Sequence, residues 1–278
     1  MLKKVFTFVH SVIWWAYWGF MIGIGIFFDT VVWPGNRDKC RALERFWART
    51  LMKLGGVKLD ISGQENLPKN ETVVYMPNHQ SDLDWPIVFA AVPGQYLFLA
   101  KKELFDLPIF GTYMRLQNYI PIERSKIRGS LKTYQEVLRL IKEGNSVVIY
   151  PEGTRASREE LQQFKPFSFF FLQEAKVRVV PIVIDGSIKV QKKGSRLIYP
   201  GRIRVRILPP VSFDSIYGLE KKEFCAAASD MVRQAMWGEL KNNGAIRYAG
   251  AGVSYQAENS AGKSYACKEP ESGTGTGK

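Results

Sequence analysis

The sequence predicts an α/β protein with a mixed sheet flanked by helices and an N-terminal membrane-anchoring helical motif. Three features predict it: an uncharged apolar run from Val5 to Phe28, short apolar segments alternating with helical patterns after Gly55, and a glycine-rich polar composition after Asn243. We therefore divide the chain into membrane-anchoring helices (1–54), an α/β domain (55–243) and a tail (244–278). The tail is expected to be disordered, because its composition cannot bury enough apolar surface to order it.

The first apolar run contains no Lys, Arg, Asp or Glu and exceeds the roughly 20 residues that a helix needs to cross a bilayer. A cleaved signal peptide is the alternative, but the run is too long and lacks a small-residue cleavage site. Gly19 and Gly23 form a GxxxG face, so we expect a second helix to pack there. Tryptophans suited to the headgroup region are Trp14, Trp15, Trp18 and Trp33.

Residues 36–56 form the predicted second helix. Its apolar stripe at helical spacing is Leu43, Phe46, Trp47, Thr50, Leu51 and Leu54. Such a helix either lies in the membrane interface or packs in a core, because both environments bury the same stripe. Basic residues stand on both sides of the first run, so the positive-inside rule allows a hairpin with both ends cytoplasmic or a single span.

The region after Gly55 alternates strands with helices. The predicted strands are VKLDIS, TVVYM, YLFLA, SVVIY, VRVVPIVI and RIRVRIL. Residues 130–144 form a predicted helix that stops at Gly144, and a later helix is expected from Leu219 to Leu240. This alternation is typical of an α/β domain.

Charge and sulfur content limit the possible partners. The formal net charge of +13 favours nucleic acid, an anionic membrane face or phosphate-bearing substrates. Cys40, Cys225 and Cys267 lack CxxC spacing, which indicates a reducing compartment. The chain has only two histidines, His10 and His79, and we expect neither a structural metal nor a cofactor.

The segment MPNHQSDLDWP follows a predicted strand and places His79 five residues before Asp84. Five residues turn about 500° on a helix, so the two side chains meet only if His79 lies in a loop and Asp84 near the next helix start. Pro86 favours a helix start between Asp82 and Pro86. Asp84 can then accept the Nδ1 proton and leave Nε2 as a base. The alternative is that Ser81, Asp82 and Asp84 only cap the helix.

A second polar segment, PEGTR, follows the predicted strand SVVIY. Ser157 and Glu160 have the spacing of a capping box, so we expect a helix to begin after this loop. Arg155 would then lie near a helix N-terminus, where backbone N–H groups and a guanidinium favour a phosphate. The alternative is a plain polar turn.

NHQSDLD and PEGTR, in this order and spacing, resemble the motifs of the glycerolipid acyltransferase superfamily, especially the 1-acylglycerol-3-phosphate acyltransferases. The segments YIPIERS with Arg124, AKKELFDLPIFG with Lys101 and VVPIVI with Pro181 match further blocks of that family. The resemblance covers roughly residues 63–212. It implies that 55–243 is a glycerolipid acyltransferase domain carried on an N-terminal membrane motif, which agrees with the fold predicted above.

The resemblance implies transfer of a fatty acyl chain from acyl-CoA or acyl carrier protein to the 2-hydroxyl of lysophosphatidic acid, giving phosphatidic acid. It places the enzyme on the lipid bilayer, at the cytoplasmic face of the inner or the endoplasmic reticulum membrane. His79 is the implied general base and Asp84 its partner, while Glu152 organises the PEGTR loop. The implied substrate-binding residues are Lys101, Arg124, Glu152, Gly153, Thr154 and Arg155.

Alternatives remain at this stage. The acceptor can be glycerol 3-phosphate or another lysophospholipid, and Ser81 can serve as a nucleophile activated by His79. The basic stretch 189–206 raises the alternative of a membrane-tethered nucleic-acid-binding protein, but no recognition signature accompanies it and we expect no nucleic acid partner. The segment FKPFSFFF departs from the family's small residues, and we predict that its phenylalanines pack in the core.

Overall fold

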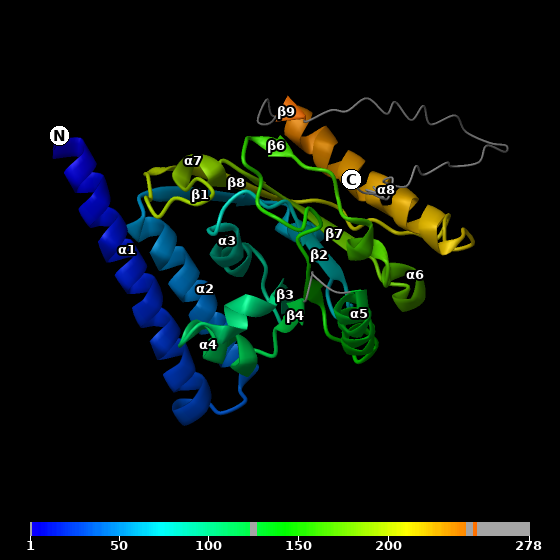
Figure 1. Cartoon of the computed structure of the whole chain (residues 1–278), viewed down its shortest axis with the longest axis horizontal. Helices are drawn as coiled ribbons and strands as arrows, with labels where there is room; N and C mark the ends of the chain where they lie inside the picture. Colours follow the sequence, from blue (N-terminus) through cyan, green and yellow to red (C-terminus); the bar gives the residue numbers. More distant parts are fainter. Residues whose placement is uncertain (1, 123–126, 243–246, 249–278) are drawn as a thin grey trace, which may run out of the picture.

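The computed structural model describes residues 2–122, 127–242 and 247–248 (Figure 1). Its centre is a seven-stranded sheet with the strand order β1-β8-β7-β2-β5-β3-β4. All neighbouring strands in it are parallel except β7 and β8, so the predicted mixed sheet is confirmed. The strands are β1 (Val57–Ser62), β2 (Val74–Pro77), β3 (Leu97–Lys101), β4 (Ile120–Ile122), β5 (Val147–Val148), β7 (Val179–Asp185) and β8 (Gly201–Ile207).

All six predicted strands are present. The sequence-based assignment lacks β4, because three residues with a central proline carry no recognisable alternation. β4 pairs with β3 at the edge of the sheet, where a proline is tolerated.

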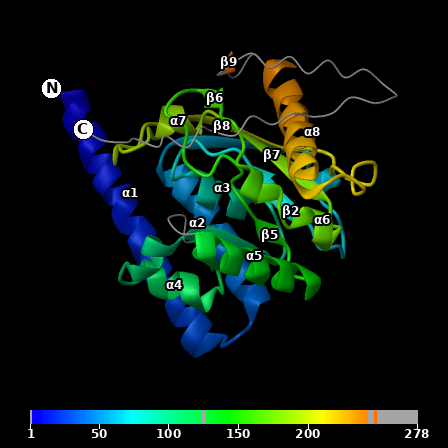
Figure 2. The ribbon, with the colours of Figure 1, turned by 45° about the vertical axis from the view of Figure 1, so that its right-hand side comes forward.

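Helices cover both faces of the sheet (Figures 1 and 2). Apolar side chains of α1, α2, α3 (Asp84–Ala91) and α4 (Phe110–Leu116) pack in one core cluster. Those of α5 (Ile127–Lys142), α6 (Leu172–Ala175) and α8 (Lys221–Asn242) pack in a second cluster. Shorter elements are η2 (Gln64–Asn66), η3 (Lys102–Asp106), η4 (Pro166–Phe169) and α7 (Ser187–Val190).

The N-terminal region folds as two helices, α1 (Leu2–Phe27) and α2 (Arg37–Leu54), with a π-helix, η1 (Phe28–Val32), continuing α1. α2 begins after Asn36, whose side chain accepts a hydrogen bond from the backbone of Lys39 at 3.2 Å and so caps the helix. Arg41 and Glu44 are buried and pair at 2.5 Å, and Arg41 also donates to the Tyr96 carbonyl at 2.8 Å. α2 therefore packs as a core helix against the α/β domain.

The prediction that a second helix packs on the Gly19 and Gly23 face of α1 is wrong. Trp14 Nε1 donates to the Leu51 carbonyl at 2.9 Å, and the Tyr17 hydroxyl lies 2.6 Å from Thr50 Oγ1, so bulky side chains join α1 to α2. A Cβ added to Gly19 or Gly23 would meet no atom within 4 Å. The two helices thus meet on the tryptophan face of α1, because burying large aromatic surface outweighs close backbone approach.

The described residues include one helical segment, Lys4–Val32, that is long and apolar enough to cross a membrane. Several large apolar side chains on it are exposed, among them Phe6, Phe20 and Val31. An exposed apolar face of this length is compatible with the predicted membrane anchor.

The prediction that a helix begins directly after PEGTR is also wrong. Glu160 and Leu161 form β6, which pairs with β9 (Arg247–Tyr248), and the next helical turn is η4. The Ser157–Glu160 capping pattern is a local signal, and here tertiary hydrogen bonds of the loop override it. The predicted disordered tail lies outside the described residues except for the two residues of β9.

Candidate active site

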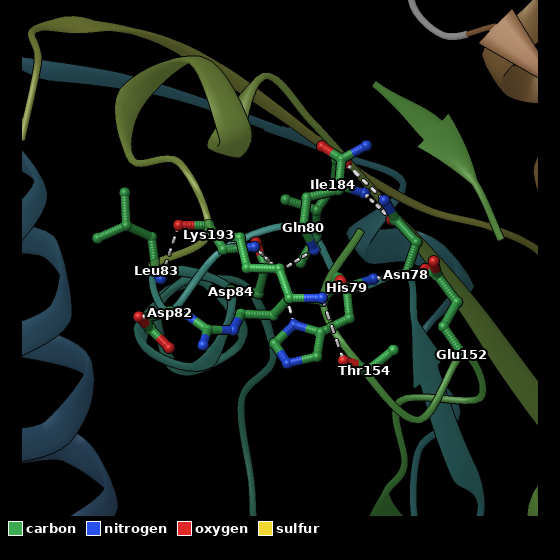
Figure 3. A network of polar contacts seen from close by, with 12 residues as sticks. Asn78, His79, Gln80, Asp82, Leu83, Asp84, Glu152, Thr154, Ile184 and Lys193 are labelled. Atoms are coloured by element: carbon green, nitrogen blue, oxygen red, sulfur yellow. Dashed lines mark hydrogen bonds and ion pairs between the residues drawn. The ribbon is translucent and has the colours of Figure 1, made fainter. Parts of the chain in front are cut away.

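His79 lies in the loop between β2 and α3, as the spacing of the motif predicts. Its Nδ1 is 2.8 Å from Asp84 Oδ2 (Figure 3). The same carboxylate oxygen accepts the backbone N–H groups of Gln80 at 2.6 Å and Ser81 at 2.8 Å. Asp84 is the first residue of α3 and is fully buried. The loop wraps around its carboxylate through these hydrogen bonds, which fix the imidazole.

Asn78 attaches the start of this loop to β7. Its side-chain amide donates to the Ile184 carbonyl at 2.9 Å and accepts from the Ile184 N–H at 2.6 Å. Both partners are buried, so these bonds satisfy a polar side chain that would otherwise be costly to bury. Sequence reasoning missed Asn78, although an asparagine directly after an apolar strand was an available signal.

Glu152 joins the two polar loops. Its Oε1 accepts the His79 N–H at 2.7 Å, and its Oε2 accepts the Gln162 backbone N–H at 3.1 Å and side-chain amide at 2.9 Å. The Ala156 N–H donates a hydrogen bond to the His79 carbonyl at 2.8 Å. Burial raises the pKa of Glu152 to about 7, although the hydrogen bonds oppose that shift. The buried carboxyl thus holds the PEGTR loop against the backbone of His79.

Tyr150 lies under the imidazole. The rings of Tyr150 and His79 stack with their centroids 4.1 Å apart and 24° between their planes. Burial raises the pKa of Tyr150 well above its ordinary value, so the phenol stays protonated. The sequence did not single out this tyrosine, because an aromatic residue at a strand end is indistinguishable from a core residue.

A cavity of about 1020 Å³ opens onto His79. The predicted substrate-binding residues Lys101, Gly153, Thr154 and Arg155 line the same cavity. Its remaining walls are mostly apolar: Trp15, Trp18, Gly19 and Ile22 of α1 on one side, and Tyr134, Val137, Phe167 and Phe171 among the residues of the α/β domain. Nε2 of His79 has no hydrogen-bond partner among the described residues, since the one bond of the ring is made by Nδ1.

Two cationic side chains of the cavity are paired with acidic neighbours. Arg155 contacts Asp82 at 2.5 Å, and Lys101 lies 3.2 Å from Glu103. The first pair is partly exposed and the second is exposed, and an incoming anion can compete with such carboxylates for the same donors. Arg124 lies outside the described residues.

Comparison with known proteins identifies the family. A family model described as "Acyltransferase" matches residues 58–185. A 1-acyl-sn-glycerol-3-phosphate acyltransferase of Chlamydomonas reinhardtii is 31% identical over 236 residues, which cover 80% of this chain and 68% of that protein. The chain belongs to this acyltransferase family.

Two further relatives define the extent of the likeness. A chloroplastic 1-acyl-sn-glycerol-3-phosphate acyltransferase of Brassica napus is 34% identical over 64% of this chain, but the match spans only about half (51%) of that relative. The crystal structure of the 1-acyl-sn-glycerophosphate acyltransferase PlsC from Thermotoga maritima superposes with a TM-score of 0.72 at 21% identity, covering 86% of this chain and 98% of that one. This likeness shows that the fold is shared.

Ser81 is fully buried. Its hydroxyl donates to Gln191 Oε1 at 2.8 Å and accepts the Leu83 N–H at 3.2 Å. A nucleophilic serine needs its proton shared with the base, whereas this proton is directed to an amide oxygen. The geometry therefore gives no support to the alternative of a Ser81 nucleophile.

The phenylalanines of FKPFSFFF divide between core and cavity. Phe169 is fully buried and Phe171 nearly so, as predicted. Phe171 also borders the cavity together with Phe167, whereas Phe170 is exposed, so the prediction of core packing is wrong for this residue. The segment thus packs in the core and at the same time forms part of the cavity wall.

The three arginines of strand β8 form ion pairs with acidic side chains of neighbouring elements. Arg202 pairs with Asp60 at 2.8 Å, Arg204 with Asp185 at 3.3 Å and Arg206 with Glu239 at 2.6 Å. Each of these arginines is thus engaged in an ion pair within the fold. Within the described ranges, no group of three or more His, Cys, Asp or Glu could hold a metal ion. Cys40 and Cys225 are buried free thiols, and Cys267 is outside those ranges.

Proposed function

We propose that the protein transfers a fatty acyl chain from acyl-CoA or acyl carrier protein to the 2-hydroxyl of lysophosphatidic acid, producing phosphatidic acid. The observation that carries this proposal is the His79–Asp84 pair at 2.8 Å, which opens with Arg155 onto one largely apolar cavity. A base, a phosphate-binding group and an apolar pocket are what the reaction needs. Membership of the acyltransferase family supports the same reaction.

His79 is the proposed general base. Asp84 holds the proton on Nδ1, so the unprotonated Nε2 can accept the proton of the acceptor hydroxyl as its oxygen attacks the thioester carbonyl. When the tetrahedral intermediate collapses, the carbon–sulfur bond breaks and the imidazolium returns the proton to the departing thiolate. The products are the new ester and a free thiol, and no acyl-enzyme forms.

Arg155 is the proposed ligand of the acceptor's phosphate. Its guanidinium lines the cavity that contains His79, and binding requires the phosphate to displace or share the contact with Asp82. Lys101 lines the same cavity, and we include Arg124 on the basis of the motif alone. Holding the phosphate here places the hydroxyl close to Nε2, which supplies a large part of the rate enhancement through orientation.

The apolar walls are the proposed sites for the acyl chains. Trp15, Trp18 and Ile22 of α1 form one wall, so a lipid can pass between the bilayer and the cavity along the anchor. We place the enzyme on the cytoplasmic face of the membrane, because Cys40 and Cys225 are free thiols, as expected in a reducing compartment.

The proposal is tested by acyl transfer with purified full-length protein in mixed micelles. Radiolabelled acyl-CoA and acyl carrier protein are supplied in turn with lysophosphatidate, glycerol 3-phosphate or a lysophospholipid with a different head group. Label should appear in phosphatidate, and His79→Ala should abolish it. Transfer to glycerol 3-phosphate alone would contradict the acceptor assignment while leaving the chemistry of His79 intact.

A further inference from the structure

Residues 191–198 join α7 to β8 and form what we call the 191–198 loop. The Tyr199 N–H donates to the Val190 carbonyl at 2.9 Å and closes the loop at its base. In Figure 1 this yellow-green segment extends from α7 to α1, and in Figure 3 Lys193 lies beside the residues around His79. The loop therefore lies between the N-terminal helix and the active site.

Gln191 connects this loop to the segment that carries the base. It is 1% exposed, its Oε1 accepts the Ser81 hydroxyl at 2.8 Å, and its Nε2 donates to the Ser195 carbonyl at 3.1 Å. The Ser81 N–H in turn donates to Asp84 Oδ2. Buried hydrogen bonds of this kind specify one arrangement, because an unpaired buried donor is costly.

Lys193 connects the same loop to the PEGTR segment. Its ammonium donates to the Arg155 carbonyl at 2.7 Å and lies 3.4 Å from Thr154 Oγ1. The contact with Thr154 holds the chain before Arg155, and the contact with the Arg155 carbonyl holds the backbone of the proposed phosphate ligand itself. Lys192 is an adjacent exposed lysine of the same length and charge, so it is a matched control.

α1 fixes the far end of the 191–198 loop. Trp15 Nε1 donates to the Arg196 carbonyl at 2.7 Å, and the Ile198 N–H donates to Ser11 Oγ at 2.9 Å. Ser11 is 3% exposed and Ile198 is fully buried, so the second bond is sheltered from water. These contacts join residues more than 180 positions apart in the chain.

We propose that the 191–198 loop positions the segment that carries His79 and the segment that carries Arg155, and that α1 positions this loop. The rate of acyl transfer therefore depends on how α1 packs against the loop. Gln191 acts on His79 through Ser81, and Lys193 acts on Arg155 through the backbone. Both are positioning residues, since we assign neither a contact with the reacting atoms. The inference rests on the proposed function and adds a mechanical link between the membrane helix and the base.

Gln191→Leu tests the first connection. It removes the acceptor of the Ser81 hydroxyl, and we expect kcat to fall about tenfold with the acceptor KM unchanged, because the base is displaced while the phosphate site is intact. Ser81→Ala should lower kcat by a similar factor, and the double variant should be no slower than either single variant. Additive losses in the double variant would show that Gln191 does not act through Ser81.

Lys193→Met tests the second connection against Lys192→Met. The first should raise the acceptor KM about tenfold without changing the donor KM, because Arg155 loses its fixed position, and the second should leave both unchanged. Lys193→Arg should restore part of the acceptor affinity, since it can still donate to the carbonyl. Equal effects of the two methionine variants would overturn the role of Lys193, leaving only a general effect of charge.

The decisive experiment is Ser11→Ala in the full-length chain, assayed on phosphatidylcholine vesicles that contain lysophosphatidate, because Ser11 contacts the loop and does not line the cavity. We expect kcat to fall at least about fivefold while the protein still sediments with the vesicles, because the buried Ile198 N–H loses its acceptor on α1. An unchanged kcat, or a loss that only follows reduced sedimentation, overturns the inference. Absence of transfer by the wild type would instead refute the proposed function.

Discussion

The imidazole of His79 stacks on the phenol of Tyr150, with ring centroids 4.1 Å apart. Asp84 fixes the Nδ1 edge of the same imidazole at 2.8 Å, so one contact sets the tautomer and the other sets the plane of the ring. The Tyr150 hydroxyl is buried and has no hydrogen-bond partner among the described residues. The ring and the hydroxyl of Tyr150 therefore have separable effects.

Tyr150→Phe and Tyr150→Leu should differ sharply. Phenylalanine keeps the stack and removes an unpaired buried hydroxyl, so kcat should stay close to wild type and the free energy of unfolding should rise by up to about 1 kcal/mol. Leucine loses the stack, and kcat should fall about tenfold through misplacement of the base. Steady-state kinetics and urea unfolding of both variants measure this. Equal kcat values for the two would show that the stack does not orient His79.

His79→Ala should abolish acyl transfer without unfolding the protein. Asp84→Asn should lower kcat by about 10²- to 10⁴-fold, because an amide holds the imidazole tautomer less well than a carboxylate does. Asp84 also accepts two backbone N–H groups, so circular dichroism and thermal unfolding must accompany the kinetics. Turnover at the wild-type rate in His79→Ala would remove the base from the mechanism.

Glu152 should make stability pH-dependent. Burial raises its pKa from 4.5 to about 7, so the folded state binds more protons than the unfolded state between these values. Its contribution is therefore fully present below pH 4.5 and is lost as the pH rises through about 7, with a full span of about 3 kcal/mol. Urea unfolding at several pH values should show this fall.

Glu152→Gln should flatten that pH dependence, because the amide does not titrate. It should also lower stability at acidic pH, since the amide NH2 faces N–H groups of Gln162 or His79 that then lose an acceptor. If wild type and variant lose stability in parallel from pH 4.5 to 7, another group is responsible for the titration.

Local signals predicted the His79–Asp84 geometry. A strand end, a proline in the first helical turn and a five-residue spacing together leave one way for the two side chains to meet, and the structure has it. The central strands β2, β3 and β7 were predictable because buried parallel strands leave continuous apolar runs, whereas β8 was predictable from its alternation of apolar residues and arginines.

Long-range contacts account for what the sequence did not predict. The capping pattern at Ser157 predicted a helix, but the Gln162 N–H binds Glu152 and the chain pairs as β6 instead. The ion pair of Arg155 with Asp82 and the hydrogen bond from the Ser81 hydroxyl to Gln191 join positions 73 and 110 residues apart. No spacing rule reaches so far, because such pairs are set by the packing of whole elements.

Arg155→Ala should raise the acceptor KM. A guanidinium–phosphate contact is charge-assisted and often bidentate, so its loss should cost about 2 kcal/mol, or roughly thirtyfold in KM, and should lower kcat by loosening the position of the hydroxyl. Arg155→Lys should recover only part of the affinity, because an ammonium offers a point charge in place of a planar fork. Michaelis kinetics with lysophosphatidate varied at saturating acyl-CoA, and then the reverse, separate the two substrate sites.

Asp82→Asn should have the opposite effect on the acceptor. Asp82 contacts Arg155 at 2.5 Å in a pair that is partly exposed, and the phosphate must compete with this carboxylate for the guanidinium. The asparagine still accepts one hydrogen bond but carries no charge, so the acceptor KM should fall by about two- to fivefold, as expected for a partly screened ion pair. Asp82→Asn combined with Arg155→Ala should then behave as Arg155→Ala alone, because the competition disappears with the arginine. A rise in the acyl-CoA KM for Arg155→Ala, with the acceptor KM unchanged, would place the donor's phosphates at Arg155 and reverse the assignment of the two substrates.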